Sequence, residues 1–275
     1  METKIEFKVH ESETVFFIIK LLISAILYYF IIDFLIEEFS SYDPQKNAQY
    51  ILILYVVLIF VYLFGRFGLL IGYIKGNAIK IGENQFPNIY NIVVTQSNML
   101  GLKSIPTVYI MQSGGVLNAF AARFMGNNYV VLYSEIVEIA YEKDINLLKF
   151  IIGHELGHIK RNHMVKRLLL FPSLVVPFLG PAYSRGCEYT CDNIGFNLAP
   201  DGLKSGLLVL ASGRSIYKKV NLEEYLKQDY GDDSFWKWFA ELVSSHPNFT
   251  KRIAALENET TLEGKGPATI SIEEN

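Results

Sequence analysis

The chain has 275 residues, of which 51% are hydrophobic and 19% charged, and its formal net charge is −3 at pH 7. The small negative charge and the lack of a long basic run argue against nucleic acid as a partner. A mean hydropathy of +0.23 together with many Phe and Tyr residues favours a membrane protein. The two cysteines, Cys187 and Cys191, are too few for a disulfide scaffold and are expected to be buried, reduced thiols.

Two apolar runs near the N-terminus predict membrane spans over residues 14–36 and 50–74. Each run is close to the roughly 20 residues that a helix needs to cross the hydrocarbon core. Residues 1–76 would then form a membrane anchor. Acidic residues predominate between the runs and lysines flank their outer ends, so the positive-inside rule places both chain ends in the cytoplasm. Two buried core helices are the alternative interpretation.

From residue 77 the composition changes to that of a soluble α+β domain, which we expect to extend to residue 258. The predicted elements are a helix over 86–100, strands over 107–111 and 129–133, a third strand at 118–120, a long helix after Asp144, and a helix over 203–217 with Asp201 as its N-cap. Leu148, Ile152 and Ile159 supply the buried stripe of the long helix. The polar tail 259–275 is expected to be disordered.

The long helix carries the motif H-E-x-x-H at His154-Glu155-Leu156-Gly157-His158. Residues four apart lie on one face of a helix, so both imidazoles can reach a single cation. Glu155 can then meet a water at that cation and take its proton, which is the chemistry of zinc hydrolases. The alternative is an amphipathic helix with two ordinary histidines, since the five letters recur by accident in roughly one chain in a hundred.

A catalytic zinc needs a third protein ligand and one open position. Glu188 is a candidate, and Asp192 follows one helical turn later, where it could hold an imidazole N–H. The metzincin pattern requires a third histidine at position 164, which holds Met164, so that family is excluded. His163 lies about 140° further round the helix than His158 and is expected not to be a ligand.

Four features in this order resemble the HtpX-like membrane zinc peptidases, gluzincins related to the CAAX prenyl proteases. They are Asn118-Ala119-Phe120, the H-E-x-x-H, Ser184-Arg185 with Glu188 and Asp192, and Ser245-His246-Pro247 with Arg252. The resemblance covers residues 77–257. It implies one Zn²⁺ per chain, held by His154, His158 and Glu188, with Glu155 as the general base.

The resemblance also implies roles for residues around the metal. Asp192 would orient His154, His246 would stabilise the oxyanion or the leaving group, and Arg252 would support the site. Asn118, Ala119 and Phe120 would lie on an edge strand that pairs with an extended polypeptide substrate.

The chain departs from the HtpX-like pattern after the second histidine. Such chains usually carry further membrane spans there, whereas only about thirty residues separate His158 from Glu188 here. Residues 168–183 are apolar but short, and a single crossing would leave Glu188 on the opposite side of the membrane from His158. Because Glu188 must come back to the side where His158 lies, this segment either dips into the bilayer and returns or lies on its surface.

The sequence therefore predicts two N-terminal transmembrane helices followed by a mostly helical zincin-type catalytic domain with a small β-sheet. The function expected is that of a cytoplasm-facing, membrane-anchored zinc metalloendopeptidase, and the resemblance implies membrane-protein quality control. A site-2-type intramembrane protease is one alternative, but charged residues bracket the metal helix and are costly in hydrocarbon. A prenyl-protein endopeptidase and a catalytically inactive zinc-binding domain are the others.

Overall fold

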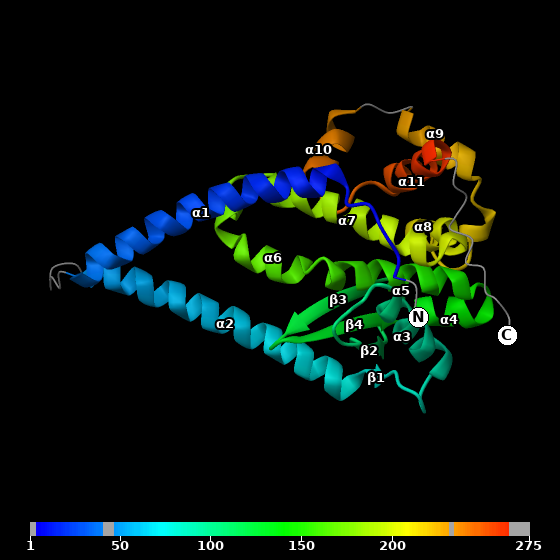
Figure 1. Cartoon of the computed structure of the whole chain (residues 1–275), viewed down its shortest axis with the longest axis horizontal. Coiled ribbons are helices and arrows are strands. Elements are labelled where there is room, and N and C mark those ends of the chain that lie inside the picture. The colour runs from blue at the N-terminus through cyan, green and yellow to red at the C-terminus, as the bar shows by residue number, and fades with distance from the viewer. Residues whose placement is uncertain (1–3, 41–46, 231–233, 264–275) are drawn as a thin grey trace.

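The computed structural model describes residues 4–40, 47–230 and 234–263, and it confirms the α+β architecture (Figure 1). The helices are α1 (Glu11–Ser40), α2 (Asn47–Asn77), α3 (Pro87–Met99), α4 (Ser134–Glu142), α5 (Ile145–Lys160), α6 (His163–Leu169), α7 (Leu179–Leu198), α8 (Leu203–Ser212), α9 (Leu222–Tyr230), α10 (Phe235–Val243) and α11 (Phe249–Glu263). The strands are β1 (Ile79–Lys80), β2 (Thr107–Met111), β3 (Ala119–Phe124) and β4 (Asn127–Tyr133), with 3-10 turns η2 (Phe171–Val175), η3 (Pro200–Gly202) and η4 (Tyr217–Lys219). The prediction that the disordered tail begins at residue 259 is wrong, because α11 continues to Glu263; residues 264–275 lie outside the described residues.

α1 and α2 extend away from the rest of the molecule as two long apolar helices. Each has a stretch long and apolar enough to cross a membrane, Glu11–Glu37 and Ile53–Asn77, and only 11% and 0% of these windows are buried. The interpretation as two buried core helices is therefore wrong. In Figure 1 the outer ends of α1 and α2 approach each other, and their inner ends lie on opposite sides of the domain. Asp43 and Lys46, part of the charge pattern that predicts orientation, lie outside the described residues.

The sheet has the strand order β1-β2-β4-β3. β2 and β4 are parallel, whereas β3 pairs antiparallel with β4, with Ala119 opposite Leu132. Both predicted strands are confirmed, and the expected third strand begins at Ala119. β3 is a terminal strand of the sheet, and within the described part of the chain it pairs with β4 alone.

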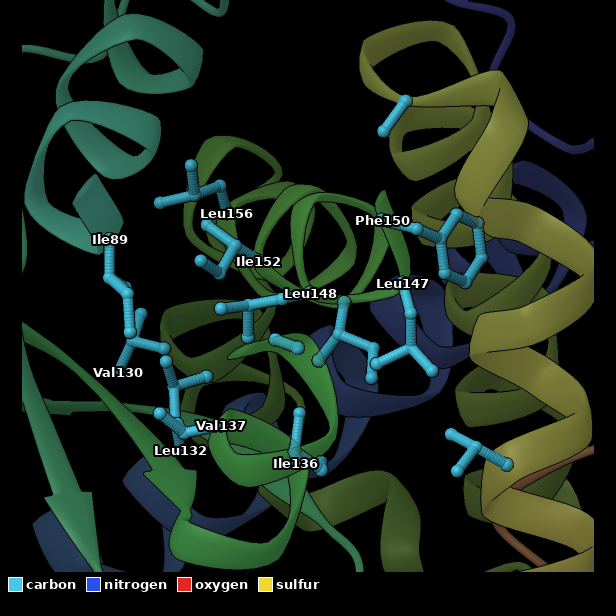
Figure 2. Close-up of a cluster of buried hydrophobic side chains, with 14 of the residues drawn as sticks. Ile89, Val130, Leu132, Ile136, Val137, Leu147, Leu148, Phe150, Ile152 and Leu156 are labelled. Atoms are coloured by element: carbon cyan, nitrogen blue, oxygen red, sulfur yellow. The ribbon is translucent and has the colours of Figure 1, made fainter. Parts of the chain in front are cut away.

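The core lies between the sheet and α5, as Figure 2 shows. Leu148, Ile152 and Ile159 are all buried, which confirms the predicted stripe. The carboxylate of Asp144 accepts a hydrogen bond of 3.0 Å from the backbone N–H of Asn146 and so caps the start of α5. This cap satisfies one of the backbone donors that a helix leaves unpaired at its first turn.

α5 and α7 pack against each other through small residues. A Cβ atom at Gly153 would lie 3.1 Å from the Cα atom of Gly195, and one at Gly157 would lie 3.3 Å from the Cα atom of Cys191. Backbones can approach this closely only where side chains are small. The consequence is that the histidines of α5 face the acidic residues of α7 directly.

The segment between α6 and α7 forms a hairpin whose turn lies between α1 and α2. The hydroxyl of Tyr28 in α1 donates to the carbonyl of Leu169 at 3.1 Å, and the ring of Phe171 lies 5.8 Å from that of Phe60 in α2. Tyr28 and Phe60 are near the middle of their helices. The chain thus reverses at this turn, and α7 brings Glu188 back to His158.

Two predictions for the region after Pro200 are wrong. Asp201 does not cap α8, because Pro200–Gly202 forms a 3-10 turn and Gly202 occupies the N-cap position without a side-chain hydrogen bond. α8 also ends at Ser212 rather than at Tyr217. The next residue, Gly213, has φ 84°, which lies outside the helical range and ends the helix.

Candidate metal centre

His154 and His158 project from the same face of α5, as the four-residue spacing predicts. Their Nε2 atoms are 3.3 Å apart. α7 brings Glu188 against both rings, with Oε2 at 3.4 Å from the Nε2 of His154 and Oε1 at 3.5 Å from that of His158. These three residues form a group of donor atoms that could hold one metal ion.

The spacing of the donor atoms fits a zinc ion. Zinc bonds of about 2.0–2.1 Å in a tetrahedron place neighbouring ligand atoms roughly 3.3 Å apart. The two Nε2 atoms are 3.3 Å apart, and each lies close to a different carboxylate oxygen of Glu188, at 3.4 Å for Oε2 and 3.5 Å for Oε1. Two imidazole nitrogens and a carboxylate converging in this way are the donor set of catalytic zinc, with a fourth position left for water or substrate.

The electrostatics of the group favour a cation. Burial lowers the pKa of His154, but the carboxylates of Asp192 and Glu188 outweigh burial and raise it to about 10. Burial raises the pKa of Glu188, yet hydrogen bonds with His154 and His158 hold it well below its usual range. Two carboxylates that stay ionised in a buried site therefore attract positive charge to the imidazoles.

Asp192 lies behind His154 on the side away from the other donors. Its Oδ1 atom is 2.9 Å from the Nδ1 of His154, and it accepts hydrogen bonds of 2.7 and 2.6 Å from Arg252 of α11. Burial raises the pKa of Asp192, but the Arg252 guanidinium overcomes this and lowers it below its usual value. A carboxylate at Nδ1 leaves Nε2 of His154 free to face a metal.

His163 occupies the matching position behind His158, which the sequence did not predict. α5 ends at Lys160, and Asn162, with φ 54°, turns the chain so that His163 begins α6. The Nδ1 atoms of His158 and His163 are 2.9 Å apart. The predicted separation of about 140° between His158 and His163 is valid only for one continuous helix. Because the chain turns at Asn162, this angle does not apply. His163 is thus close to His158 without being one of the three converging donors.

Glu13 of α1 lies behind His163 in turn. Its buried carboxylate is 3.3 Å from the Nε2 of His163 and accepts a hydrogen bond of 2.8 Å from Arg161. Burial lowers the pKa of His163, and the nearby charges of His158 and Lys166 lower it further, whereas Glu13 raises it. The net result is a pKa of about 4, so the ring is neutral at pH 7. A carboxylate at the start of a predicted membrane span was the only sequence signal for this contact.

Glu155 and His246 open onto the same cavity as the three donors. The cavity has a volume of about 1280 Å³ and is lined by Glu155, His154, His158, Glu188 and His246, among others. The Nε2 atom of His246 is 3.6 Å from the Oε1 of Glu188, and its Nδ1 atom is 2.9 Å from the hydroxyl of Ser245. Its side chain is 62% exposed, so it lies at the rim of the group and can meet a substrate.

Arg185 fixes the segment that carries His246. Its Nη1 atom donates to the carbonyls of Glu241, Leu242 and Ser244 at 2.8, 3.0 and 2.9 Å. These carbonyls lie at the C-terminal end of α10, where a cation is favourable. Arg185 of the Ser184-Arg185 pair thus holds this segment next to the cavity.

The edge strand forms one wall of the cavity. Leu117, Asn118, Ala119, Phe120 and Ala121 all line it. Asn118 accepts a hydrogen bond of 2.9 Å from the backbone N–H of Ala119 and one of 3.1 Å, at its carbonyl, from Tyr133. The predicted substrate strand therefore lies beside the predicted metal ligands, although the two are more than thirty residues apart in sequence.

Comparison with known families matches Peptidase family M48 over residues 83–176 and 170–260, about two thirds of the chain. The chain belongs to peptidase family M48. The match contains the H-E-x-x-H motif, Glu188, Asp192 and Arg252. Membership of this metallopeptidase family and the likeness to an HtpX homologue confirm the HtpX-like resemblance.

Two curated relatives are similar over part of their length. The chain is 26% identical over 172 residues to the plastoglobule-localized metallopeptidase 48 of Arabidopsis thaliana, covering 56% of this chain and 48% of that one. It is 33% identical over 88 residues to the protease HtpX homolog of Halobacterium salinarum, covering 32% and 29%. The chain therefore spans about half or less of the length of these M48 relatives. The crystal structure of S. mikatae Ste24p gives a TM-score of 0.48 at 14% identity, covering 91% of this chain and 67% of that one.

Proposed function

We propose that this M48 protein is a membrane-anchored zinc metalloendopeptidase that hydrolyses peptide bonds in extended polypeptides. One observation carries the proposal. The Nε2 atoms of two histidines and the carboxylate of Glu188 converge at separations that suit a zinc ion, and Glu155 lines the same cavity. His154, His158 and Glu188 would hold the ion.

Bound Zn²⁺ supplies Lewis acidity, which polarises a carbonyl and lowers the pKa of water toward neutrality. Glu155 acts as the general base and takes a proton from the attacking water as the water oxygen bonds to the scissile carbonyl carbon. As the C–N bond breaks, Glu155 gives that proton to the departing amine. His246, at the rim of the donor group, donates a hydrogen bond to the oxygen that gains negative charge.

The substrate we propose is a polypeptide in extended conformation. β3 presents an edge that pairs with β4 on one side only among the described strands, and the first residues of β3 line the cavity. A peptide strand added there would make main-chain hydrogen bonds to β3 and pass the metal donors. Main-chain pairing tolerates many side chains, which suits an enzyme of membrane-protein quality control.

The lipid bilayer is the second partner we propose. Apolar side chains are exposed at the turn of the α6–α7 hairpin, where Leu168 is 69% and Val175 72% exposed. This turn contacts the middle of both candidate spans, so spans and turn would enter the bilayer together. Of the two placements that the sequence left open, contact with Tyr28 and Phe60 favours the one in which the hairpin dips into the bilayer.

α10 extends this apolar surface. Phe235, Trp236 and Trp238 are 60%, 74% and 58% exposed, and the ring of Phe239 lies 6.4 Å from that of Phe178 beside the hairpin turn. Tryptophan is enriched where membrane meets water, because its ring is apolar and its N–H is polar. α10 would therefore lie at the interface, with the catalytic domain on the cytoplasmic side.

The proposal is tested with the full chain purified in nanodiscs. We expect one zinc per chain and cleavage of an unfolded casein-like or membrane-protein substrate. Glu155→Gln should keep its zinc and lose roughly 100- to 10,000-fold in rate, as expected for a missing general base. Glu83→Gln, an exposed glutamate away from the cavity, is the matched control.

Two results would contradict the proposal. A Glu155→Gln variant that cleaves at the rate of the unchanged chain would remove the general-base role. A chain that binds one zinc but cleaves no polypeptide would instead support the inactive zinc-binding alternative. Cleavage limited to prenylated peptides would point to the prenyl-protein endopeptidase.

A further inference from the structure

The N-terminal end of the first membrane helix reaches the back of the metal site. Glu13, in the first turn of α1, has a fully buried side chain. One of its carboxylate oxygens lies 2.8 Å from Arg161, 3.3 Å from His163 and 3.4 Å from Lys166. Two cations compensate the buried charge, so Glu13 can remain ionised away from water.

The contact depends on a close approach of backbones. A Cβ atom at Gly186 of α7 would lie 2.5 Å from the backbone nitrogen of Glu13 and 2.8 Å from its Cα atom. A side chain there would push the two helices apart. Gly186 stands only two residues before the metal-ligand candidate Glu188. Because this position is a glycine, α1 comes near enough for Glu13 to reach His163.

The hydrogen-bonded path from Glu13 through His163 to His158 has only one consistent proton arrangement when a cation occupies Nε2 of His158. His158 must then carry its proton on Nδ1 and donate it to Nδ1 of His163, 2.9 Å away. His163 must in turn carry its proton on Nε2 and donate it to Glu13, 3.3 Å away. The Glu13 carboxylate thus fixes the tautomer of His163, and His163 fixes the tautomer of His158.

We propose that Glu13 is a positioning residue that acts through His163 on His158, so that the first membrane helix completes the metal site. His154 has its carboxylate, Asp192, in direct contact, whereas His158 has its carboxylate one imidazole further away. Such outer partners orient a ligand ring and increase its basicity. This inference rests on the proposed zinc site and adds the membrane anchor to it.

A second metal ion on Glu13, His163 and Cys187 is the competing interpretation, because these three side chains also form a donor group. Charge argues against it. Arg161 and Lys166 both point at the same oxygen of Glu13, and a divalent cation there would face two positive groups. The geometry therefore favours a hydrogen-bonded path to His158.

The test measures zinc affinity of the full chain in nanodiscs by competition with a chelator. Glu13→Gln should bind zinc about 10- to 100-fold more weakly, the loss typical of a missing outer partner. Glu11→Gln, on the same helical turn but exposed, is the matched control and should bind like the unchanged chain. Glu13→Asp, which keeps the charge, should recover part of the affinity. The visible absorption spectrum of Co²⁺-loaded protein should change in Glu13→Gln and not in Glu11→Gln.

A double-mutant cycle separates this path from a general effect on folding. His163→Gln leaves the pair between Glu13 and Arg161 in place, so it also serves if Glu13→Gln does not fold. Because both residues act on one ligand, the double variant should lose little more zinc affinity than His163→Gln alone. Additive losses, or unchanged affinity and cobalt spectrum in both single variants, would overturn the inference. Failure of the unchanged chain to bind zinc would instead refute the proposed function, and two zinc ions per chain would favour the second metal site.

Discussion

Arg252 donates two hydrogen bonds of 2.7 and 2.6 Å to the carboxylate of Asp192, and both side chains are buried. The pair joins α11 to α7 directly behind His154. Arg252 also lies 3.6 Å from Glu188, so one guanidinium contacts one of the three candidate donors directly and reaches a second, His154, only through Asp192. The C-terminal helix of the described chain is in this way tied to the metal centre.

Asp192→Asn should weaken zinc binding about 10- to 100-fold, because the ring of His154 loses its charged partner. It should also destabilise the fold by up to about 3–5 kcal/mol, since buried Arg252 loses its closest counter-ion and keeps only Glu188 at 3.6 Å. Zinc competition and thermal unfolding measure the two effects. An Asp201→Asn variant, in which an exposed aspartate changes, is the control. Equal zinc affinity in both variants would show that Asp192 does not orient His154.

Glu135 should make the fold sensitive to acid. It accepts hydrogen bonds from the backbone N–H of Gly115 at 2.7 Å and from two serine hydroxyls, which fixes the turn before β3. Burial raises the pKa of Glu135, but these hydrogen bonds and its own backbone N–H lower it below its usual value. A lowered folded pKa gives stability that is present above the unfolded pKa of about 4.3 and is lost as the pH falls through the folded value.

Glu135→Gln should therefore lower the melting temperature more at pH 7 than at pH 3. Both chains are measured after zinc removal, so that loss of metal in acid does not contribute. Glu142→Gln, an exposed glutamate on the same helix, is the control. A difference that grows toward pH 3 would contradict the assignment.

The two thiols should be unreactive in the folded protein. Cys187 and Cys191 have no exposed surface, and burial raises the pKa of Cys187 to about 12. A thiol reagent at pH 8 should label neither residue in the folded chain and both in a denatured chain, because only the exposed thiolate reacts. Mass spectrometry counts the labels. Rapid labelling of either thiol under native conditions would show that α7 is open at its contact with α5 or α1.

Intrinsic fluorescence should report directly on α10, because the chain has two tryptophans and both lie on that helix. In nanodiscs, lipids brominated near the headgroup should quench this fluorescence more strongly than lipids brominated at the chain end. The single-tryptophan variants Trp236→Phe and Trp238→Phe assign the signal. Strong quenching by aqueous iodide without quenching by brominated lipid would place α10 in water and remove it from the membrane surface.

Local sequence determined the elements and much of the site. The spacing of His154 and His158, the cap at Asp144 and the two apolar runs each depend on neighbours within one helix, so their periodicity and composition were sufficient. The order of motifs predicts that Glu188, Asp192 and Arg252 lie close to the two histidines, and the fold brings these side chains together. The prediction that Asp201 caps α8 is wrong because the proline and the glycine beside it favour a 3-10 turn.

Tertiary structure decided what no local pattern contains. The left-handed turn at Asn162 and the close contact at Gly186 bring His163 and Glu13, 150 residues apart, to the back of the site. A helical wheel assumes one continuous helix, so it does not predict the position of His163 after the chain turns. Hydropathy shows only that Glu13 lies at the edge of an apolar run. The sequence by itself thus determined which atoms can hold a cation, because those atoms share a helix face or a motif. Only packing between distant helices determined which groups support them, because a hydrogen bond depends on distance in space and not along the chain.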